Sequence, residues 1–505
     1  MSPKNAVARP EWRPLNEHTK SKLAPEAHLK PVSPAAPETR LKGSVEFSEP
    51  DRVLCLVEAR AATGAYVLYW MQKSQRASDN PALSAAVAAA NALELPLLVL
   101  FIRTNYPGAT LGHYRFMLDG LLETAQELRS RGAAFRIEEG HPPAIVAKWA
   151  AEAAIVFCDA GRLRIEREWR AELARKLALA AEPRPLYEVE SEAVVPPRIA
   201  SVKDEWSAAT FRKKITEAIP HYLEPSREEN LVCAASRLGL DKDLVSRALS
   251  KGEEIPSRTG DRSAELSFAP EAGNKAARLR FRRFLEKGLE KYAEAHGDPA
   301  KSGGSGMSAY LHFGQISARF LGHAAIKKGG LGATAFIEQL VVRRELAVNF
   351  VLRNADYDRY EGLPDWARRS LAEAANDKRD FLYTRSEFEA AATHDPYWNA
   401  AQDEMVLTGA MHGYMRMYWG KKILEWSRDP ESAFETALFL NDRYSLDGRD
   451  PNGYAGVAWC FGKHDRPWKG RPVFGTIRYM NDRGLKRKFD MDNYLERVAK
   501  LKKRR

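Results

Sequence analysis

Short apolar strands alternate with amphipathic helices between residues 66 and 189, and this alternation restricts the fold more than any other feature of the sequence. Segment 97–102 reads LLVLFI, a continuous apolar run of the kind that is buried on both faces of a sheet. Strands separated by single helices predict a doubly wound parallel sheet, a Rossmann-like α/β domain. The predicted segments are strand 66–70, helix 82–93, strand 97–102, helix 113–131, strand 134–137, helix 143–153, strand 155–158, helix 166–180 and strand 186–189.

Ligands of such sheets bind at the carboxyl ends of the strands. No GxGxxG sequence follows the first predicted strand, so a dinucleotide site in this half is not supported.

Changes in composition divide the chain into five parts. Residues 1–50, rich in Pro, Lys, Ala and Glu, are expected to be a disordered arm. The α/β domain covers 51–190, and a linker with mixed signals covers 191–272. From 273 to 495 the pattern predicts an all-α domain, and residues 496–505 form a basic tail. The helices predicted in the second half are 274–296, 313–328, 334–353, 385–392, 403–426 and 432–442.

Charge and cysteine content narrow the classes of function. The formal net charge is +11 over 505 residues and the pI is about 9.3, which favours a polyanionic partner such as nucleic acid. The four cysteines are scattered and form no CxxC pair, so neither a disulfide framework nor a metal site is indicated and a cytoplasmic, reducing location is expected. The most apolar run, 82–102, is interrupted by Asn91, Glu94 and Pro96 and does not predict a membrane span.

Residues 394–452 combine three tryptophans with a polar loop. The segment 403–426 has no proline and is predicted to be one buried helix. Trp419 and Trp426 share one face of it, about 10 Å apart along the axis, and Trp398 stands near its start. The loop 441–452 is dense in Asp, Asn, Arg and Gly. Buried core packing explains a single tryptophan well, whereas an electron relay to a redox cofactor held by the loop explains the whole row; the pattern alone leaves both open.

A glycine- and serine-rich segment precedes the helical half. Residues 302–308 read SGGSGMS, and such segments supply backbone N–H groups and hydroxyls that bind phosphate. Most Gly/Ser runs are flexible loops, so this signal depends on the tryptophans and the polar loop for support.

Several long motifs resemble the class II cyclobutane pyrimidine dimer photolyases of the photolyase–cryptochrome superfamily, over about residues 67 to 490. The motifs are YWMQKSQRASDNPAL, SGMSAYLHFGQIS, DPYWNAAQDEM, MHGYMRMYWGKKILEW, LNDRYSLDGRDPNGYAGVAW, HDRPW, RPVFGTIRYM and KRKFD. The resemblance implies an α/β domain followed by a helical FAD domain. It also implies FAD bound without a covalent link, active as the reduced anion, and light-driven repair of pyrimidine dimers in UV-damaged DNA by a monomer.

The resemblance also assigns roles to residues of the helical half. Trp419, Trp398 and Trp426 would be the near, middle and surface members of a photoreduction relay. Asn441 would face flavin N5, and Arg416 and Asp447 would form a salt bridge beside the flavin ring. The remaining residues expected to hold FAD are Tyr292, Gly304, Ser305, Gly306, Met307, Ser308, Asn349, Gly448 and Asp450.

A dimer must leave the duplex to reach the flavin, and it then needs aromatic walls and polar contacts. Trp459, Trp468 and Met417 are the expected walls. Glu338 or Gln339 is expected to hydrogen-bond a thymine edge. Arg466 and Arg478 are expected to fill the gap in the duplex or hold its backbone, although each is also interpretable as an ordinary surface cation.

The chain departs from the family pattern at Gln339, where a second carboxylate is usual, and at Val348, where an aspartate is expected. Some family members carry an antenna chromophore, either a deazaflavin or a folate. The sequence of the α/β domain does not indicate either of them. Three alternatives remain: a cryptochrome-like FAD photoreceptor without repair activity, a (6-4) photolyase, and a colourless DNA-binding protein with an aromatic core.

Overall fold

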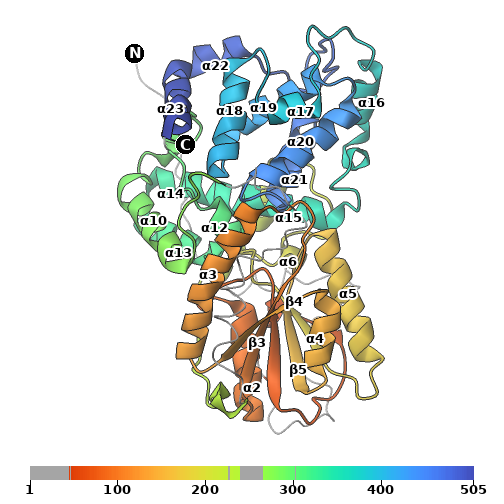
Figure 1. Cartoon of the computed structure of the whole chain (residues 1–505), viewed down its shortest axis with the longest axis vertical. Helices are drawn as coiled ribbons and strands as arrows, with labels where there is room; N and C mark the ends of the chain where they lie inside the picture. Colours follow the sequence, from red (N-terminus) through yellow and green to blue (C-terminus); the bar gives the residue numbers. More distant parts are fainter. Residues whose placement is uncertain (1–44, 46, 226–227, 239–265, 302, 505) are drawn as a thin grey trace.

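Two halves of different architecture, an α/β domain and a helical domain, are stacked along the long axis of the molecule (Figure 1). The computed structural model describes residue 45 and residues 47–225, 228–238, 266–301 and 303–504. Most of the predicted arm 1–50 therefore lies outside the described residues. Its end is packed, since the ring of Phe47 lies 6.0 Å from that of Phe157 in the sheet, so the prediction of disorder is wrong for residues 47–50.

Six strands of the described chain form one sheet in the order β1-β6-β5-β2-β3-β4. All neighbours except β1 and β6 are parallel, which confirms the predicted parallel sheet. Edge strand β1 was not predicted and runs antiparallel to β6, because the short link 58–65 to β2 cannot contain the crossover that a parallel connection needs. The strands are β1 (Val53–Val57), β2 (Tyr66–Met71), β3 (Leu97–Arg103), β4 (Ala134–Glu139), β5 (Ala153–Asp159) and β6 (Leu186–Val189).

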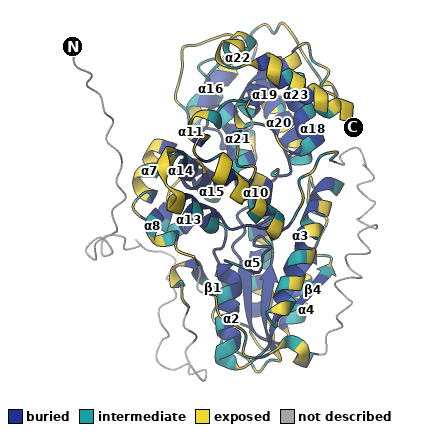
Figure 2. Cartoon of the chain, turned by 90° about the vertical axis from the view of Figure 1, so that its left-hand side faces the viewer, coloured by how far each residue is buried: buried dark blue, intermediate teal, exposed yellow. Residues whose placement is uncertain are grey.

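Helices cover both faces of this sheet. Every residue of the central strands β2, β3 and β5 is buried, and alternate side chains enter opposite cores: Tyr69 packs with α2 and α3, while Trp70 packs with α4 and α5. Figure 2 shows the strands as the buried centre of this half. The four helices are α2 (Pro81–Leu93), α3 (Leu111–Ser130), α4 (Pro142–Ala150) and α5 (Arg164–Ala178).

The linker between the halves is anchored to the helical domain. The carboxylate of Glu345 accepts hydrogen bonds from the backbone N–H groups of Val194 at 2.6 Å and Val195 at 3.3 Å. Burial raises the pKa of Glu345 to about 7. The described linker contains α6 (Pro197–Ala200), α7 (Ala208–Ile215), α8 (Ile219–Tyr222) and η2 (Ala235–Leu238).

The second half is helical, as predicted, but several of its helices are shorter than the sequence pattern indicated, while α20 is longer. The predicted helix 403–426 is wrong: Gly409 adopts φ 70° and ends α18, and α19 begins at Gly413, because glycine favours the left-handed conformation that terminates helices. The helices are α10 (Asn274–Lys287), α11 (Tyr292–Ala295), α12 (Ser308–His312), α13 (Ala318–Lys328), α14 (Gly330–Ile337), η6 (Glu338–Arg343), α15 (Arg344–Arg353), η7 (Tyr360–Gly362), α16 (Asp365–Glu373), α17 (Arg385–Glu389), α18 (Pro396–Thr408), α19 (Gly413–Trp426), α20 (Pro430–Tyr444), α21 (Pro451–Cys460), α22 (Asp482–Lys488) and α23 (Met491–Arg504).

The basic tail is part of a packed helix as far as Arg504. Val498 of α23 is buried, and Arg497 Nη1 lies 2.7 Å from Glu404 Oε1 on α18. Within the described ranges, no helix has the length and apolar character needed to cross a membrane.

Candidate functional site

A cavity of about 390 Å³ opens in the helical domain where α12, α15, α19 and the start of α21 meet. Its volume falls in the range of small-molecule sites. We call it the central cavity. It is lined by Tyr292, Ser305, Met307, Ser308, Leu311, His312, Phe336, Gln339, Leu340, Arg344, Ala410, Met411, Gly413, Arg416, Asp447, Asp450 and Asn452.

An ion pair crosses the central cavity. Arg416 Nη2 on α19 lies 3.2 Å from Asp447 Oδ1 in the loop before α21, so the salt bridge expected between them is present. The Nε atom of Arg416 is buried and has no hydrogen-bond partner among the described residues. An unpaired buried donor beside an acidic group suits a polar ligand that offers acceptors.

A second buried pair lies at the start of α21. Nδ1 of His312 lies 3.1 Å from Asp450 Oδ2, and Asp450 Oδ1 accepts from the N–H of Asn452 at 2.9 Å. Burial lowers the pKa of His312. Burial opposes ionisation of Asp450, but the hydrogen bond from His312 and the charge of Lys73 outweigh it and keep its pKa below the usual range.

The glycine- and serine-rich segment forms one side of the cavity. Ser305, Met307 and Ser308 line it, together with Tyr292, whose pKa burial raises to about 12. Gly306 has φ +67°, and a Cβ there would lie 2.3 Å from Arg280 Nε, so glycine is required for the turn. Hydroxyls, a guanidinium from Arg344 and an amide from Asn452 are donors that fit phosphate and ring-carbonyl groups.

Three indoles form a continuous row of contacts between α18 and α19, which we call the indole stack although Trp398 and Trp426 meet edge to face, with planes 63° apart. The ring centroids of Trp419 and Trp398 are 6.3 Å apart with planes 7° from parallel, and those of Trp398 and Trp426 are 6.4 Å apart. Trp419 Nε1 donates to Gln402 Oε1 at 2.9 Å, and Trp398 Nε1 donates to the carbonyl of Trp419 at 3.0 Å. The spatial order is therefore 419, 398, 426, and Trp419 lies one helical turn beyond Arg416.

Trp426 does not lie on the surface, contrary to expectation. Only 4% of it is exposed, because His394 and Tyr383 cover its ring at centroid distances of 4.8 and 5.8 Å. Phe381, which stacks on His394 at 3.7 Å, is exposed. Aromatic side chains therefore continue the stack from Trp426 to the surface.

Several residues predicted to bind the cofactor do not line the cavity. Asn349 lies outside the lining, and its amide binds the linker through the N–H of Glu205 at 2.8 Å and the carbonyl of Lys203 at 2.9 Å. The amide of Asn441 donates to Asp442 at 3.1 Å. Gly448 packs against that helix end, where a Cβ would lie 2.8 Å from the carbonyl of Asn441. Gly304 and Gly306 are exposed.

The two candidates for a thymine contact are separated by the fold. Gln339 lines the central cavity. Glu338 points elsewhere, with its carboxylate 2.6 Å from Arg212 Nη2 and 3.1 Å from Arg343 Nε. Both belong to η6, a π-helical segment, and its wider turn changes which side chains share a face. Glu338 therefore does not line this cavity, and its contact with a thymine edge stays a prediction.

The other lesion candidates form a ladder of cations and indoles beyond α21. Arg478 Cζ lies 5.7 Å from the ring centroid of Trp459 and 5.0 Å from that of Trp468, and Arg466 Cζ lies 5.5 Å from Trp468. Trp468 is 40% exposed. Met417, on α19, is half-buried, and its carbonyl accepts from the thiol of Cys460 at 3.7 Å.

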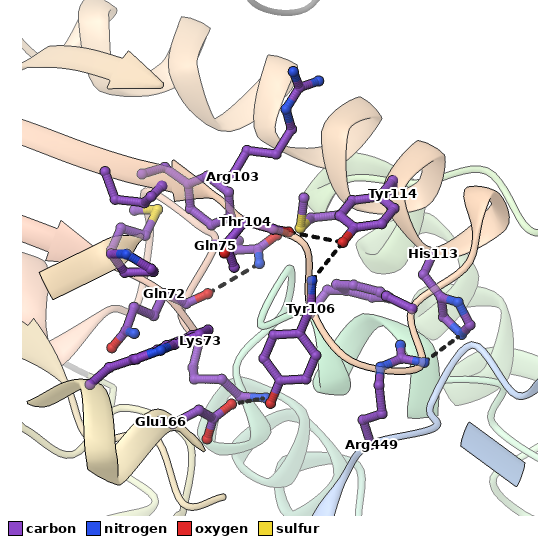
Figure 3. A pocket seen from close by; sticks show the side chains of 18 of the residues that line it. Gln72, Lys73, Gln75, Arg103, Thr104, Tyr106, His113, Tyr114, Glu166 and Arg449 are labelled. Carbon is purple, nitrogen blue, oxygen red and sulfur yellow. Dashed lines mark hydrogen bonds and ion pairs between the residues drawn. The ribbon is translucent and has the colours of Figure 1, made fainter. Parts of the chain in front are cut away.

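A smaller cavity of about 110 Å³ lies at the carboxyl ends of β2 and β3. We call it the sheet-edge cavity (Figure 3). Gln72 Oε1, Gln75 Oε1, Arg103 Nη1 and the Tyr106 hydroxyl are buried there without a partner among the described residues. His312 lines both cavities. Sheets of this kind bind ligands at this edge, but the sequence assigned no ligand to it and singled out none of these side chains.

Comparison with known proteins identifies the family. A family model described as DNA photolyase matches residues 67–230. The deoxyribodipyrimidine photo-lyase of Methanothermobacter thermautotrophicus is 46% identical over 87% of this chain and 95% of its own length. That of Oryza sativa subsp. japonica is 42% identical over 87% and 88%. A solved bacterial class III photolyase from Agrobacterium tumefaciens shares the fold, with a TM-score of 0.65 at 19% identity over 87% of each chain. The chain therefore belongs to the DNA photolyase family of enzymes.

Proposed function

We propose that this enzyme splits cyclobutane pyrimidine dimers in DNA by light-driven electron transfer, as a class II photolyase acting as a monomer in the cytoplasm. The observation that carries the proposal is the indole stack, which ends one helical turn from the Arg416–Asp447 pair of a polar cavity. Core packing accounts for single tryptophans, but it does not account for a stack directed at a cavity with an unpaired guanidinium nitrogen. The relatives named deoxyribodipyrimidine photo-lyase support the same reaction.

The residues of the central cavity fit FAD. Ser305, Ser308 and Arg344 offer the donors that a pyrophosphate needs, and Arg416 with Asp447 offers a donor and an acceptor for the ring edge. Bound in its reduced form, FAD supplies the electron that light transfers to the dimer. The protein orients the two reactants, and the apolar side chains Leu311, Phe336 and Leu340 exclude water. Asn441 and Gly448 shape the loop that carries Asp447.

We also propose which side chains contact the dimer. Gln339 is proposed to hydrogen-bond a thymine edge at the cavity, and Met417, Trp459 and Trp468 to form apolar walls for the flipped dimer. Arg466 and Arg478 are proposed to hold the DNA backbone near the opening.

Replacing Gln339 tests the thymine contact. We expect Gln339→Leu to weaken binding of a dimer-containing oligonucleotide by about threefold to tenfold, the loss of one hydrogen bond, with binding of undamaged DNA unchanged. Fluorescence anisotropy with both oligonucleotides measures this. The matched control is Glu338→Gln, the adjacent residue, which binds Arg212 outside the cavity and should leave dimer affinity as it is. Equal losses from both substitutions would exclude a specific contact by Gln339.

We further propose that the sheet-edge cavity holds an antenna chromophore. Its aromatic walls, Tyr106 and Trp169, suit a planar ring, and its unpaired polar atoms suit an extended edge of carbonyls and amides. Protein purified from its native host should then show an absorption band additional to that of FAD. Tyr106→Ala should remove that band and leave FAD in place.

Repair itself is tested with the reduced holoenzyme and a dimer-containing oligonucleotide, in light and in darkness. Loss of the dimer only in the light is the expected result. If the protein binds FAD but leaves the dimer intact, the repair proposal fails and a photoreceptor role without repair takes its place. A protein that purifies colourless and binds no FAD would refute both flavoprotein interpretations.

A further inference from the structure

Lys421 on α19 is a fully buried cation, with 0% of the residue exposed. Its Nζ donates to the carbonyl of Cys460 at 2.6 Å and lies 5.1 Å from the ring centroid of Trp459. Among the described residues, no carboxylate forms an ion pair with Lys421. The adjacent Lys422, by contrast, pairs with Glu425. The buried ammonium is therefore held by one carbonyl and one indole face.

A buried charge without a counter-ion is energetically unfavourable. Burial lowers the pKa of Lys421 to about 8, while the nearby Cys460 and Asp465 act in the opposite direction and Arg478 adds to the lowering. A methionine would fill a similar volume without this cost. Because the buried charge does not stabilise the fold, we expect Lys421 to have a functional role.

Lys421 lies at the buried end of the cation–indole ladder. The ring centroid of Trp459 lies 5.1 Å from Lys421 Nζ and 5.7 Å from Arg478 Cζ. Arg478 then contacts Trp468, which is exposed. Cations near an indole restrain its orientation and make the surrounding potential positive, so the ammonium acts on Trp459 from inside the protein.

We propose that Lys421 is a positioning residue for the dimer-binding surface, which fixes the Trp459 ring and the end of α21 and adds positive potential beneath the bound DNA. The inference rests on the proposed function, because Trp459 is a wall for the dimer only if the enzyme binds one. Lys421 itself does not need to touch the DNA.

A pH dependence follows from this arrangement. As the pH rises through about 8, Lys421 loses its charge, and Trp459 loses one of its two cations. The thiol of Cys460, the other nearby group with a shifted pKa, titrates higher because burial raises its pKa to about 11. Asp465 and Arg478 are the remaining charged groups that face Lys421. Affinity for the dimer should therefore decrease across this range by more than affinity for undamaged DNA.

The test measures binding of dimer-containing and undamaged oligonucleotides from about pH 7 to about pH 9.5, at constant salt. For the unmodified holoenzyme, we expect the preference for the dimer to decrease about fivefold across this range. Lys421→Met should show the weaker preference at every pH, with no pH dependence. The matched control is Lys422→Met, the next residue of the same helix, which pairs with Glu425 and faces Trp426; its pH profile should match that of the unmodified enzyme.

A thermal melt separates positioning from a structural role. At neutral pH, Lys421→Met should melt at or above the temperature of the unmodified enzyme, because a buried unpaired charge is removed. A lower melting temperature together with unchanged dimer preference would overturn the inference, as would a preference independent of pH in the unmodified enzyme, a result that does not depend on the variant. If the unmodified enzyme shows no preference for the dimer at pH 7, the proposed function itself fails.

Discussion

Trp419→Phe is expected to remove nearly all photoreduction of oxidised FAD in the isolated protein, while repair by chemically reduced enzyme continues. Trp419 is the member of the stack that lies one helical turn from Arg416 of the central cavity, and Trp398 lies a further 6.3 Å from it, centroid to centroid. Phenylalanine keeps the ring packing but cannot be oxidised as an indole can. The lost hydrogen bond to Gln402 costs about 1 to 3 kcal/mol of stability, which leaves the domain folded.

The measurement is the rate of flavin bleaching under blue light with an external reductant, read by absorbance. Trp366→Phe is the matched control, because Trp366 belongs to the same core but lies outside the stack, and it should photoreduce at the unmodified rate. Photoreduction that persists in Trp419→Phe would show that electrons reach the cavity by another route. Repair that also fails after chemical reduction would assign Trp419 to cofactor binding instead.

The sheet was predictable because strands that are buried on both faces consist of continuous apolar residues. Runs such as 97–102 contain no polar residue, so their strand character does not depend on neighbours. The edge strand β1 is also an apolar run, VLCLV, but no helix separates it from β2, so the alternation of strands and helices does not reveal it. The break between α18 and α19 does not interrupt the apolar periodicity, and it depends on Gly409, which ends α18 in the left-handed conformation.

Sequence spacing alone predicted little of the candidate site, and the Arg416–Asp447 pair was expected only from the family resemblance. One helix fixes the separation of Trp419 from Trp426, but the contact of Trp398 with Trp419 depends on how α18 packs on α19. Glu338 and Gln339 are adjacent in sequence, and only the π-helical turn of η6 determines which of them faces the cavity. The sequence did not predict His312 as a site residue. Its role depends on Asp450, which is distant in the chain and adjacent in the fold.

Asp450 should have the largest effect on stability of the residues at the central cavity. Its carboxylate caps α21 through the N–H of Asn452 and binds His312, and all of these groups are buried or half-buried. Asp450→Ala would leave His312 without its acceptor and α21 without a cap, and Lys73 would keep only Glu166 and Glu192 as nearby negative charges. We expect the free energy of unfolding to fall by about 3 to 5 kcal/mol, measured by urea denaturation of the apoprotein, so that lost cofactor binding does not add to the effect.

Asp429 provides the matched control, because it too precedes a proline and caps a helix. Its Oδ1 accepts from the N–H of Ser432 at 2.8 Å, but its side chain is 35% exposed, so Asp429→Ala should cost only about 1 kcal/mol. Burial raises the pKa of Asp429, but hydrogen bonds from Ser432 outweigh burial, so this pKa is lowered in the folded protein as well. Both carboxylates therefore stabilise the fold less in acid. Since the pKa of Asp450 is lowered in the folded protein, its stabilisation is complete above the pKa of an unfolded aspartate, about 4, and disappears as the pH falls below it. Equal losses from the two substitutions at neutral pH would show that Asp450 acts only as a helix cap and that the pair with His312 contributes nothing.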